Sequence, residues 1–484
     1  MLLSGLALGA VLGAVMQRGR FCVTGMLRDL FTLRQSRGLV ALFVVIAVHA
    51  VGLAALTSAG VIAPEYPTFR PAAVIVGGFI FGLSIILAGG CASGTWYRSA
   101  EGLVGSWFAL LFYGLSAAAM KTGALSGFNT WMKTWDTDWT TLPETLHVSP
   151  WWFAVPLALG TAWAARSALR HDAARPKAEL DQPWYRKPLH PYVAGAAIGL
   201  LGVIAWPLSA ATGRNDGLGI TTPTAHVVGY TVTGEAKFLN WGTLLVLGLF
   251  VGAFAAAKAS GEFRVRVPDA TTTLRATVGG IGMGVGASLA GGCTVGNGMV
   301  QTSLFSYQGW IALAMIAAGV FVGSKLWLKP EAAPAKPQPF QMATGLVTLP
   351  QTKATKTRPL GDGRYALDTL GAVCPFPLIE AKDALAELND GEKLVIDFDC
   401  TQATQSIPQW AADNGHGIEG FTQKGDAGWQ ITVVKNTFAA TPVSRTQRKA
   451  PPGEGGASSA ANELLRTSAG RREHPRRCRR GRRR

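Results

Sequence analysis

The segments Gly89-Gly-Cys91-Ala-Ser-Gly94 and Gly291-Gly-Cys293-Thr-Val-Gly-Asn-Gly298 each follow a long apolar stretch. Both place a cysteine in a glycine-rich interruption of a hydrophobic run. Irregular backbone at membrane depth is tolerated only where it is buried in protein or lines a cavity. The repeated interruption therefore predicts a multi-pass membrane protein, a transporter, with a path between its helices.

The composition also indicates a membrane-embedded chain. Of the 484 residues, 48% are hydrophobic and 15% are charged, whereas about 25% are charged in typical soluble proteins. A spanning helix needs ~20 apolar residues. Long runs without charged residues predict five spans, and shorter runs bring the predicted number to nine; they cover residues 39–63, 71–97, 102–120, 189–213 and 238–257, then 150–165, 276–292, 308–323 and 2–16.

The pattern repeats in the two halves of this region. Gly19-Arg20 and Gly213-Arg214 each follow an apolar run and precede a Gly-Gly-Cys segment. Basic short loops favour the cytoplasmic side, which puts the N-terminus outside and everything after Lys325 inside. We therefore predict an all-α membrane domain over residues 1–328 with inverted repeats and short re-entrant helices. Its repeats are residues 1–121 and 189–328, its linking helix is 150–166, and its substrate site lies near the midplane.

A different composition follows the last apolar run. Residues 329–360 are rich in Pro, Ala, Lys and Thr, which predicts a linker. Residues 361–437 predict a small α+β two-layer domain of order βαβαββ, with both helices on one face of the sheet. Residues 471–484 contain nine Arg and one Glu, half of the net charge of +16. We expect residues 438–484 to be a disordered basic tail and not a nucleic-acid-binding segment.

The cysteines are the residues best suited to chemistry. Cys374 precedes Pro375 at the start of a predicted helix, where unpaired amides and the helix dipole favour a thiolate. A structural, buried cysteine is the alternative there. The six cysteines are widely scattered, with no disulfide framework or zinc spacing. No P-loop is present either, so we predict no metal, no cofactor and no built-in ATPase.

Two interpretations of the membrane cysteines remain open. Free cysteine is usually a small buried hydrophobe, and glycines allow close helix packing. Alternatively, Cys22, Cys91 and Cys293 line the path, and helix N-termini after the breaks donate amides to the substrate. Arg20 would then attract an anion, or else extend to the interface or bind carbonyl groups. Other candidate contacts in the two breaks are Gly90, Ser93, Thr95, Gly292, Thr294 and Asn297.

The C-terminal part resembles a known family. Leu367-Asp-Thr-Leu-Gly-Ala-Val-Cys-Pro-Phe-Pro377, followed by Trp410-Ala-Ala-Asp-Asn-Gly-His416, is similar to the TusA-like sulfur carriers. The match covers about residues 364–435, and its Cys-Pro-x-Pro signature is specific. The resemblance implies that Cys374 carries a persulfide sulfur and hands it to cytoplasmic sulfur-accepting proteins. The family usually has Asp-Ile-Pro where this chain has Ser406-Ile-Pro, which favours a thiol that acts on incoming sulfur, with sulfurtransferase or thiosulfate-decomposing activity.

Residues 1–328 resemble the YeeE/YedE family, whose members include thiosulfate-uptake transporters. The resemblance rests on Gly19-Arg-Phe-Cys22 and the two Gly-Gly-Cys segments. It implies that the three cysteines relay thiosulfate through the inner membrane for sulfur assimilation. A neutral thiol donates a weak, polarizable hydrogen bond, which suits a soft divalent anion. Three alternatives remain. The first is another sulfur species such as sulfite, sulfide or a selenium analogue, and the second is a membrane sulfurtransferase that relays sulfur covalently. The third is a noncatalytic membrane anchor for the carrier domain.

Overall fold

A computed structural model describes residues 1–173, 183, 186–328, 357–372 and 375–436. Cys374, the basic tail and most of the predicted linker therefore lie outside the described residues. Met1–Ala439 form one compact unit.

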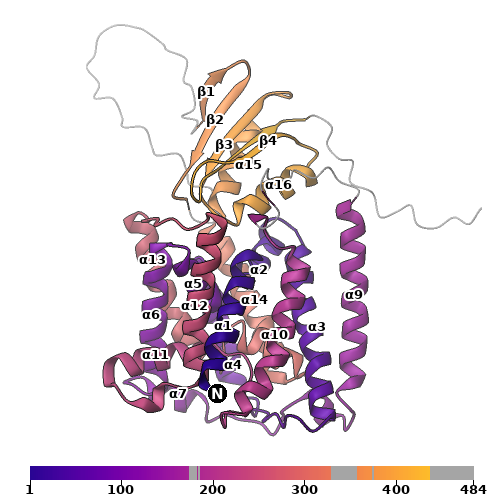
Figure 1. The fold of residues 1–484 in the computed structure, drawn as a ribbon, viewed down its shortest axis with the longest axis vertical. Coiled ribbons are helices and arrows are strands. Elements are labelled where there is room, and N and C mark those ends of the chain that lie inside the picture. The colour runs from indigo at the N-terminus through magenta and orange to yellow at the C-terminus, as the bar shows by residue number, and fades with distance from the viewer. Residues whose placement is uncertain (174–182, 184–185, 329–356, 373–374, 437–484) are drawn as a thin grey trace, which may run out of the picture. The chain divides into compact units, whose positions relative to one another are not determined.

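The first part of the chain is helical. Several long helices lie side by side, and short helices follow the glycine-rich breaks (Figure 1). The helices are α1 (Leu2–Arg18), α2 (Val23–Thr32), α3 (Arg37–Ser58), α4 (Pro71–Leu87), α5 (Ala92–Ala100), α6 (Val104–Lys121), α7 (Ser126–Met132), α8 (Leu142–Thr145), α9 (Trp151–Ala173), α10 (Pro191–Ala210), α11 (Thr221–Thr233), η2 (Ala236–Phe238), α12 (Trp241–Ser260), α13 (Ala270–Leu289), the π-helical η3 (Gly296–Gln301) and α14 (Tyr307–Trp327).

Seven helical segments in the described part of the chain are long and apolar enough to span a membrane. Two of them join a long helix to the short one after its break, namely α1 with α2 and α4 with α5. The long helices α9 and α13 are not among the seven. Arg166 and Arg170 in α9, and Arg275 with four threonines in α13, lower their hydropathy. The chain is a multi-pass membrane protein, and the predicted number of nine spans is not confirmed.

The packing of the long helices agrees with the predicted inverted repeat. Helix α1 packs against α12, and α10, its counterpart in the second half, packs against α3, the counterpart of α12. In the same way, α6 packs against α13, and its counterpart α14 packs against α4. The end of α1 meets the start of α10, where the amide of Leu189 donates to the carbonyl of Arg18 at 2.9 Å. The corresponding helices α1 and α10 therefore run in opposite directions.

Close contact between α1 and α12 depends on glycine. Gly9 and Gly13 of α1 face the carbonyl oxygens of Leu245 and Leu249, and Gly252 of α12 faces that of Ala10. A Cβ atom at any of these glycines would overlap the opposite backbone. Small residues let membrane helices approach closely, because packing replaces the hydrophobic effect as the driving force there. Glycine packing thus fixes the position of α1, whose end carries the first break.

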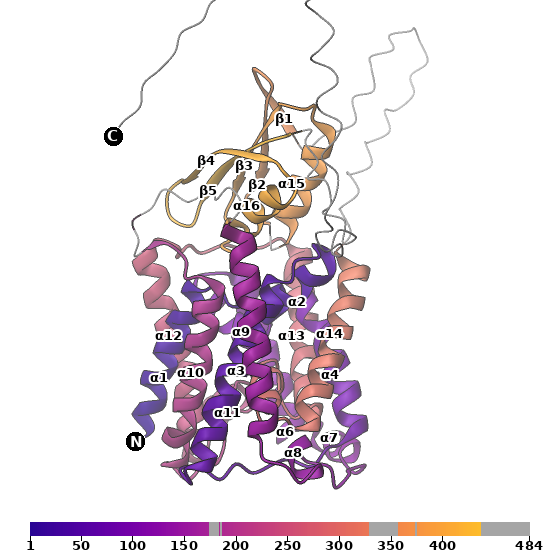
Figure 2. The same cartoon turned by 90° about the vertical axis from the view of Figure 1, so that its right-hand side faces the viewer.

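The second part of the structure is a five-stranded sheet with two helices (Figure 2). The sheet order is β1-β2-β3-β5-β4, with β2 and β3 parallel and the other pairs antiparallel. Helix α15 contacts β2 and β3, and α16 contacts α15 and β4. The elements are β1 (Thr357–Gly361), β2 (Arg364–Thr369), α15 (Phe376–Glu387), β3 (Lys393–Phe398), α16 (Ala403–Asp413), β4 (Gly417–Gln423) and β5 (Trp429–Val434).

The predicted order βαβαββ is confirmed from β2 onward, but it omits the first strand. Strand β1 occupies the end of the segment assigned to the linker and pairs with β2 as a hairpin. Asp362 and Gly363 between them have φ of 50° and 66°, which suits the tight turn that Asp-Gly favours. Pro359 is tolerated because β1 is an edge strand.

We predict that Gly252→Leu destabilises the protein by about 2 kcal/mol or more, because overpacking forces the backbones of α1 and α12 apart. Gly160→Leu in α9 is the matched control, since a Cβ there meets nothing within 4 Å. Thermal unfolding and size-exclusion profiles in detergent measure the effect. Equal melting temperatures for the two variants would contradict the close α1–α12 contact.

Candidate functional site

The first break lies between α1 and α2. Arg20 adopts a φ of 49°, a left-handed conformation that is uncommon for a residue with a side chain. The amide of Phe21 donates back to the carbonyl of Met16 at 2.9 Å. Cys22 is the extended N-cap residue of α2. The break thus turns the chain so that a cysteine precedes a buried helix N-terminus.

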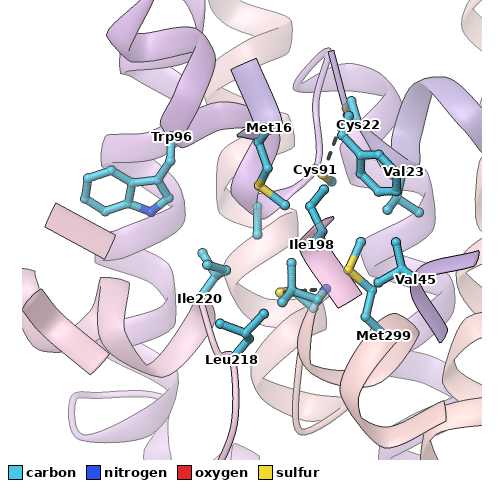
Figure 3. Packing of buried hydrophobic residues seen from close by; sticks show 14 of the residues in the cluster. Met16, Cys22, Val23, Val45, Cys91, Trp96, Ile198, Leu218, Ile220 and Met299 are labelled. Atoms are coloured by element: carbon cyan, nitrogen blue, oxygen red, sulfur yellow. Dashed lines mark hydrogen bonds between the residues drawn. The ribbon is translucent and has the colours of Figure 1, made fainter. Parts of the chain in front are cut away.

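The second cysteine of the first half faces the first one. Cys91 is the N-cap residue of α5, and its Sγ lies 3.9 Å from Sγ of Cys22 and 3.5 Å from Oγ of Ser93. Both cysteines are at most 1% exposed. Apolar side chains such as Met16 and Ile198 surround the pair (Figure 3). Two thiols and two helix N-termini, whose first-turn amides have no partner within their own helices, therefore converge among apolar side chains.

Gly94 makes this approach possible. A Cβ atom on Gly94 would lie 3.1 Å from Sγ of Cys22 and 3.3 Å from Sγ of Cys91. Both distances are too short for carbon and sulfur without a shift of one sulfur. The sequence shows a glycine shortly after the cysteine of each Gly-Gly-Cys segment. It does not show that Gly94 contacts Cys22, because only the folded chain brings them together.

The other Gly-Gly-Cys break has a different construction. Sγ of Cys293 accepts from the amide of Val295 at 3.4 Å, and the chain continues as the π-helix η3. The Asn297 amide group donates to the carbonyls of Ala290 and Gly292 at 2.9 and 3.0 Å. The hydroxyl of Thr294 is fully buried and has no hydrogen-bond partner among the described residues. Asn297 thus holds the loop, while Thr294 keeps a polar group available.

A buried charged group supports the first break. Nη2 of Arg20 donates to Oε1 of Glu262 at 2.9 Å, with side-chain exposures of 2% and 3%. Nε2 of Gln17 donates to Oε2 of Glu262 at 2.6 Å and to Oε1 of Glu101 at 3.1 Å. Neither predicted partner of Arg20, the interface or a carbonyl group, is its observed one. Nε and Nη1 of Arg20 are buried and have no partner among the described residues.

Arg98 supports the Gly89-Gly-Cys91 loop. Its Nη1 donates to the carbonyl of Gly89, and its side chain is almost fully buried. Cys91 thus directly precedes α5, and this helix carries, two turns later, the arginine that holds the loop before Cys91. Sequence reasoning missed Arg98 and Glu101, because charged residues that follow an apolar run are typical of the end of a span.

A cavity of about 530 Å³ borders this end of the helical part. Cys22 and Arg20 contribute to its wall, together with Arg37 and Lys187 and with the acidic Asp29 and Asp172. Gln402, before α16, and Gln405, in α16, complete the part of the wall that the argument uses. Gln409 of α16 also accepts from Nη1 of Arg37 at 2.7 Å. We call this space the junction chamber. Cys22 thus contacts the Cys91 thiol and also lines a cavity whose wall carries charged side chains of both signs.

The predicted site residues are distributed as follows. The structure brings Cys22, Cys91 and Ser93 together, and it places Thr294 in the other break beside Cys293. Thr95 donates its hydroxyl to the carbonyl of Ala92 at 2.8 Å. Gly90 lies against Arg98, and Gly292 lies against Asn297. A direct substrate contact stays a prediction for each of these residues. Cys374 lies outside the described residues, within which no group of His, Cys, Asp or Glu could hold a metal ion.

Comparison with known proteins identifies the family. A family model described as "Sulphur transport" matches residues 18–322. The chain belongs to the sulphur transport family. A second model, "Sulfurtransferase TusA", matches residues 365–435. Both recognised resemblances, to YeeE/YedE and to TusA-like proteins, are confirmed.

Relatives match both parts of this family member. The thiosulfate transporter TsuA of Escherichia coli is 47% identical over 334 residues, which are 68% of this chain and 94% of that protein. The thiosulfate transporter TsuA of Spirochaeta thermophila is 31% identical over 66% of this chain and 97% of its own length. The putative sulfur carrier protein TsuB of E. coli is 65% identical over 69 residues, 14% of this chain and 92% of that protein.

We predict that mild oxidation links Cys22 to Cys91 and leaves Cys293 available for alkylation, because the two sulfur atoms are 3.9 Å apart. Gly94→Val should lower the yield of linked peptide several-fold. Gly296→Val is the control, since a Cβ at Gly296 meets nothing within 4 Å. Peptide mass spectrometry after digestion identifies the linked pair. A link from Cys293 to either other cysteine would contradict this geometry.

Proposed function

We propose that this protein takes up thiosulfate across the inner membrane and delivers it to its own cytoplasmic TusA-like domain. The relatives named above match both parts of the chain, and they support transport of a sulfur anion by a protein with such a domain. In this proposal residues 1–328 form the transporter, 329–356 the linker, 357–437 the carrier domain and 438–484 the tail.

The Cys22–Cys91 pair is the observation that carries the proposal. A soft anion beside the two sulfur atoms, which already lie only 3.9 Å apart, would receive weak hydrogen bonds from neutral thiols and from the amides of two helix N-termini. The buried cation Arg98, whose charge acts on the Cys22 sulfur, offsets part of the cost of taking a dianion into an apolar region. Because each thiol contact is weak, the anion can leave as well as enter. Ionised thiols would repel it.

The junction chamber supports delivery on the far side of Cys22. Among the described residues, its wall has three basic residues, Arg20, Arg37 and Lys187, against the two acidic residues Asp29 and Asp172, and this excess of positive charge favours an anion. The wall also includes the start of α16. In the TusA-like domain the thiolate of Cys374 would attack the outer sulfur of thiosulfate. The S–S bond of thiosulfate breaks, a persulfide anion remains on Cys374, and sulfite leaves with the electron pair. Sulfur-accepting proteins in the cytoplasm would then take the persulfide sulfur.

A covalent relay is the second candidate function, because the two neighbouring thiols of Cys22 and Cys91 are also suited to passing one sulfur atom. A hydrogen-bonding path tolerates a hydroxyl in place of a thiol, whereas persulfide chemistry requires sulfur. Serine and alanine variants therefore distinguish the two.

We predict that cells without other uptake systems accumulate ³⁵S-thiosulfate when they carry the full chain. Cys91→Ala should lower the initial rate about tenfold, the effect of losing about one to two hydrogen bonds. Cys91→Ser should retain a larger part of the rate. Cys374→Ala should allow uptake but not growth on thiosulfate as sole sulfur source.

Protein amount in the membrane is the control for each variant. Loss of uptake in Cys91→Ser equal to that in Cys91→Ala would favour the covalent relay. No uptake by the folded full chain would exclude thiosulfate and leave sulfite, sulfide or a selenium analogue as the substrate.

A further inference from the structure

Glu101 is a buried carboxyl group that the proposed path does not use. It follows α5, and its side chain is fully buried. Its Oε1 accepts from Nε2 of Gln17 at 3.1 Å. Its Oε2 is buried without a hydrogen-bond partner among the described residues. No cation forms an ion pair with it within the part of the chain that the structure describes. An unpaired buried carboxylate is costly, and a proton removes that cost.

Charged and titratable groups surround Glu101 from several elements. Glu262, after α12, shares the Gln17 amide with it but is itself paired to Arg20 at 2.9 Å. The other groups that act on it are Arg98 and Tyr97 of α5, Arg266 after α12, and Arg18 of α1. Glu262 thus has cations bound to it, whereas Glu101 has only cations at longer range and a second carboxylate beyond Gln17.

The Glu101 carboxyl changes its protonation state near neutral pH. Burial raises the pKa of Glu101 to about 7, against the opposing effect of Arg266, and the negative charge of Glu262 adds to the rise. The Arg98 charge and the Gln17 hydrogen bond lower the pKa less. The group is therefore protonated below about pH 7 and ionised above it.

Arg98 connects Glu101 to the thiol pair. It holds the Gly89 carbonyl before Cys91, and its charge acts on both the Cys22 sulfur and the Glu101 carboxyl. When Glu101 is ionised, its charge cancels part of the field of Arg98. When Glu101 is protonated, that positive field is available to an anion at Cys22 and Cys91.

We propose that Glu101 is a proton-binding site linked to the anion site, so that one proton enters the protein as a divalent sulfur anion binds beside Cys22, Cys91 and Arg98. This inference rests on the proposed function. The proton comes from water and forms an O–H bond on Glu101, and no electron moves. Linkage is reciprocal: the bound anion favours protonation by the same factor by which protonation favours the anion.

We predict that thiosulfate binding to the purified full chain strengthens as pH falls from 8 to 6, by up to about tenfold. Equilibrium dialysis with ³⁵S-thiosulfate measures the affinity. A pH-sensitive dye in weak buffer measures proton uptake on binding, which should approach one proton per anion near pH 7. Thiosulfate remains a dianion throughout this range, so the proton must bind to the protein.

Three variants make the test specific. Glu101→Gln should make the affinity independent of pH and abolish proton uptake, whereas Glu101→Asp should keep both. Glu235→Gln, in an exposed turn between α11 and α12, is the control and should behave as the parent protein. A merely structural Glu101 would change affinity or yield without changing the number of protons per anion.

The outcomes separate the two proposals. Absence of thiosulfate binding by the folded parent protein at every pH contradicts the proposed function, and this inference with it. Binding that is independent of pH and takes up no proton contradicts this inference alone. Proton uptake that persists in Glu101→Gln also overturns it. If Glu101→Gln does not fold, the parent protein and Glu101→Asp still decide by their proton count.

Discussion

The structure depends on hydrogen-bond partners for the backbone groups of the two Gly-Gly-Cys breaks, which lie inside an apolar bundle. Without water, each exposed carbonyl or amide needs a partner from the protein. In one break, Arg98 reaches back from α5 to the Gly89 carbonyl. In the other, Asn297 binds the carbonyls of Ala290 and Gly292 and in turn accepts from Gln308 at 2.9 Å. Because side chains provide these partners, the loops keep their shape and the cysteines keep their positions.

The two halves share helix order but differ in chemistry. Arg20 of the first half is buried and paired with Glu262 of the second half, whereas the Arg214–Asp216 pair, which lies within the second half, is partly exposed, at 24% and 52%. The Cys22–Cys91 pair stands beside buried charges, and Cys293 stands beside an unpaired hydroxyl. Moving a dianion against an inside-negative potential of 100 mV costs about 4.6 kcal/mol, from about 2.3 kcal/mol per charge. The cost would be halved if one proton crossed the membrane together with each anion, because the net charge moved would then be one.

Local sequence patterns predicted the breaks, the repeat and most of the sheet, because each depends on residues close together in the chain. The side chains that hold the site in place could not be predicted in this way. Gln17 meets residues 84 and 245 positions away, and such pairs form only when the bundle assembles. Gly94 was visible as a glycine, but only the folded chain places Cys22 against it. Strand β1 had a local signal, the Asp362-Gly363 turn, which the Pro-rich composition before it concealed. The role of Cys374 stays a prediction.

The central claim is that a soft sulfur anion binds beside Cys22 and Cys91, in contact with both thiols. Crystals of the full chain soaked in selenosulfate, in which selenium replaces the outer sulfur of thiosulfate, test it by anomalous diffraction. The account predicts a selenium peak within contact distance of both sulfur atoms, on the side of Arg98, and its loss in Cys91→Ala. A well-occupied peak elsewhere in the helical part, with none at the pair, would contradict the account.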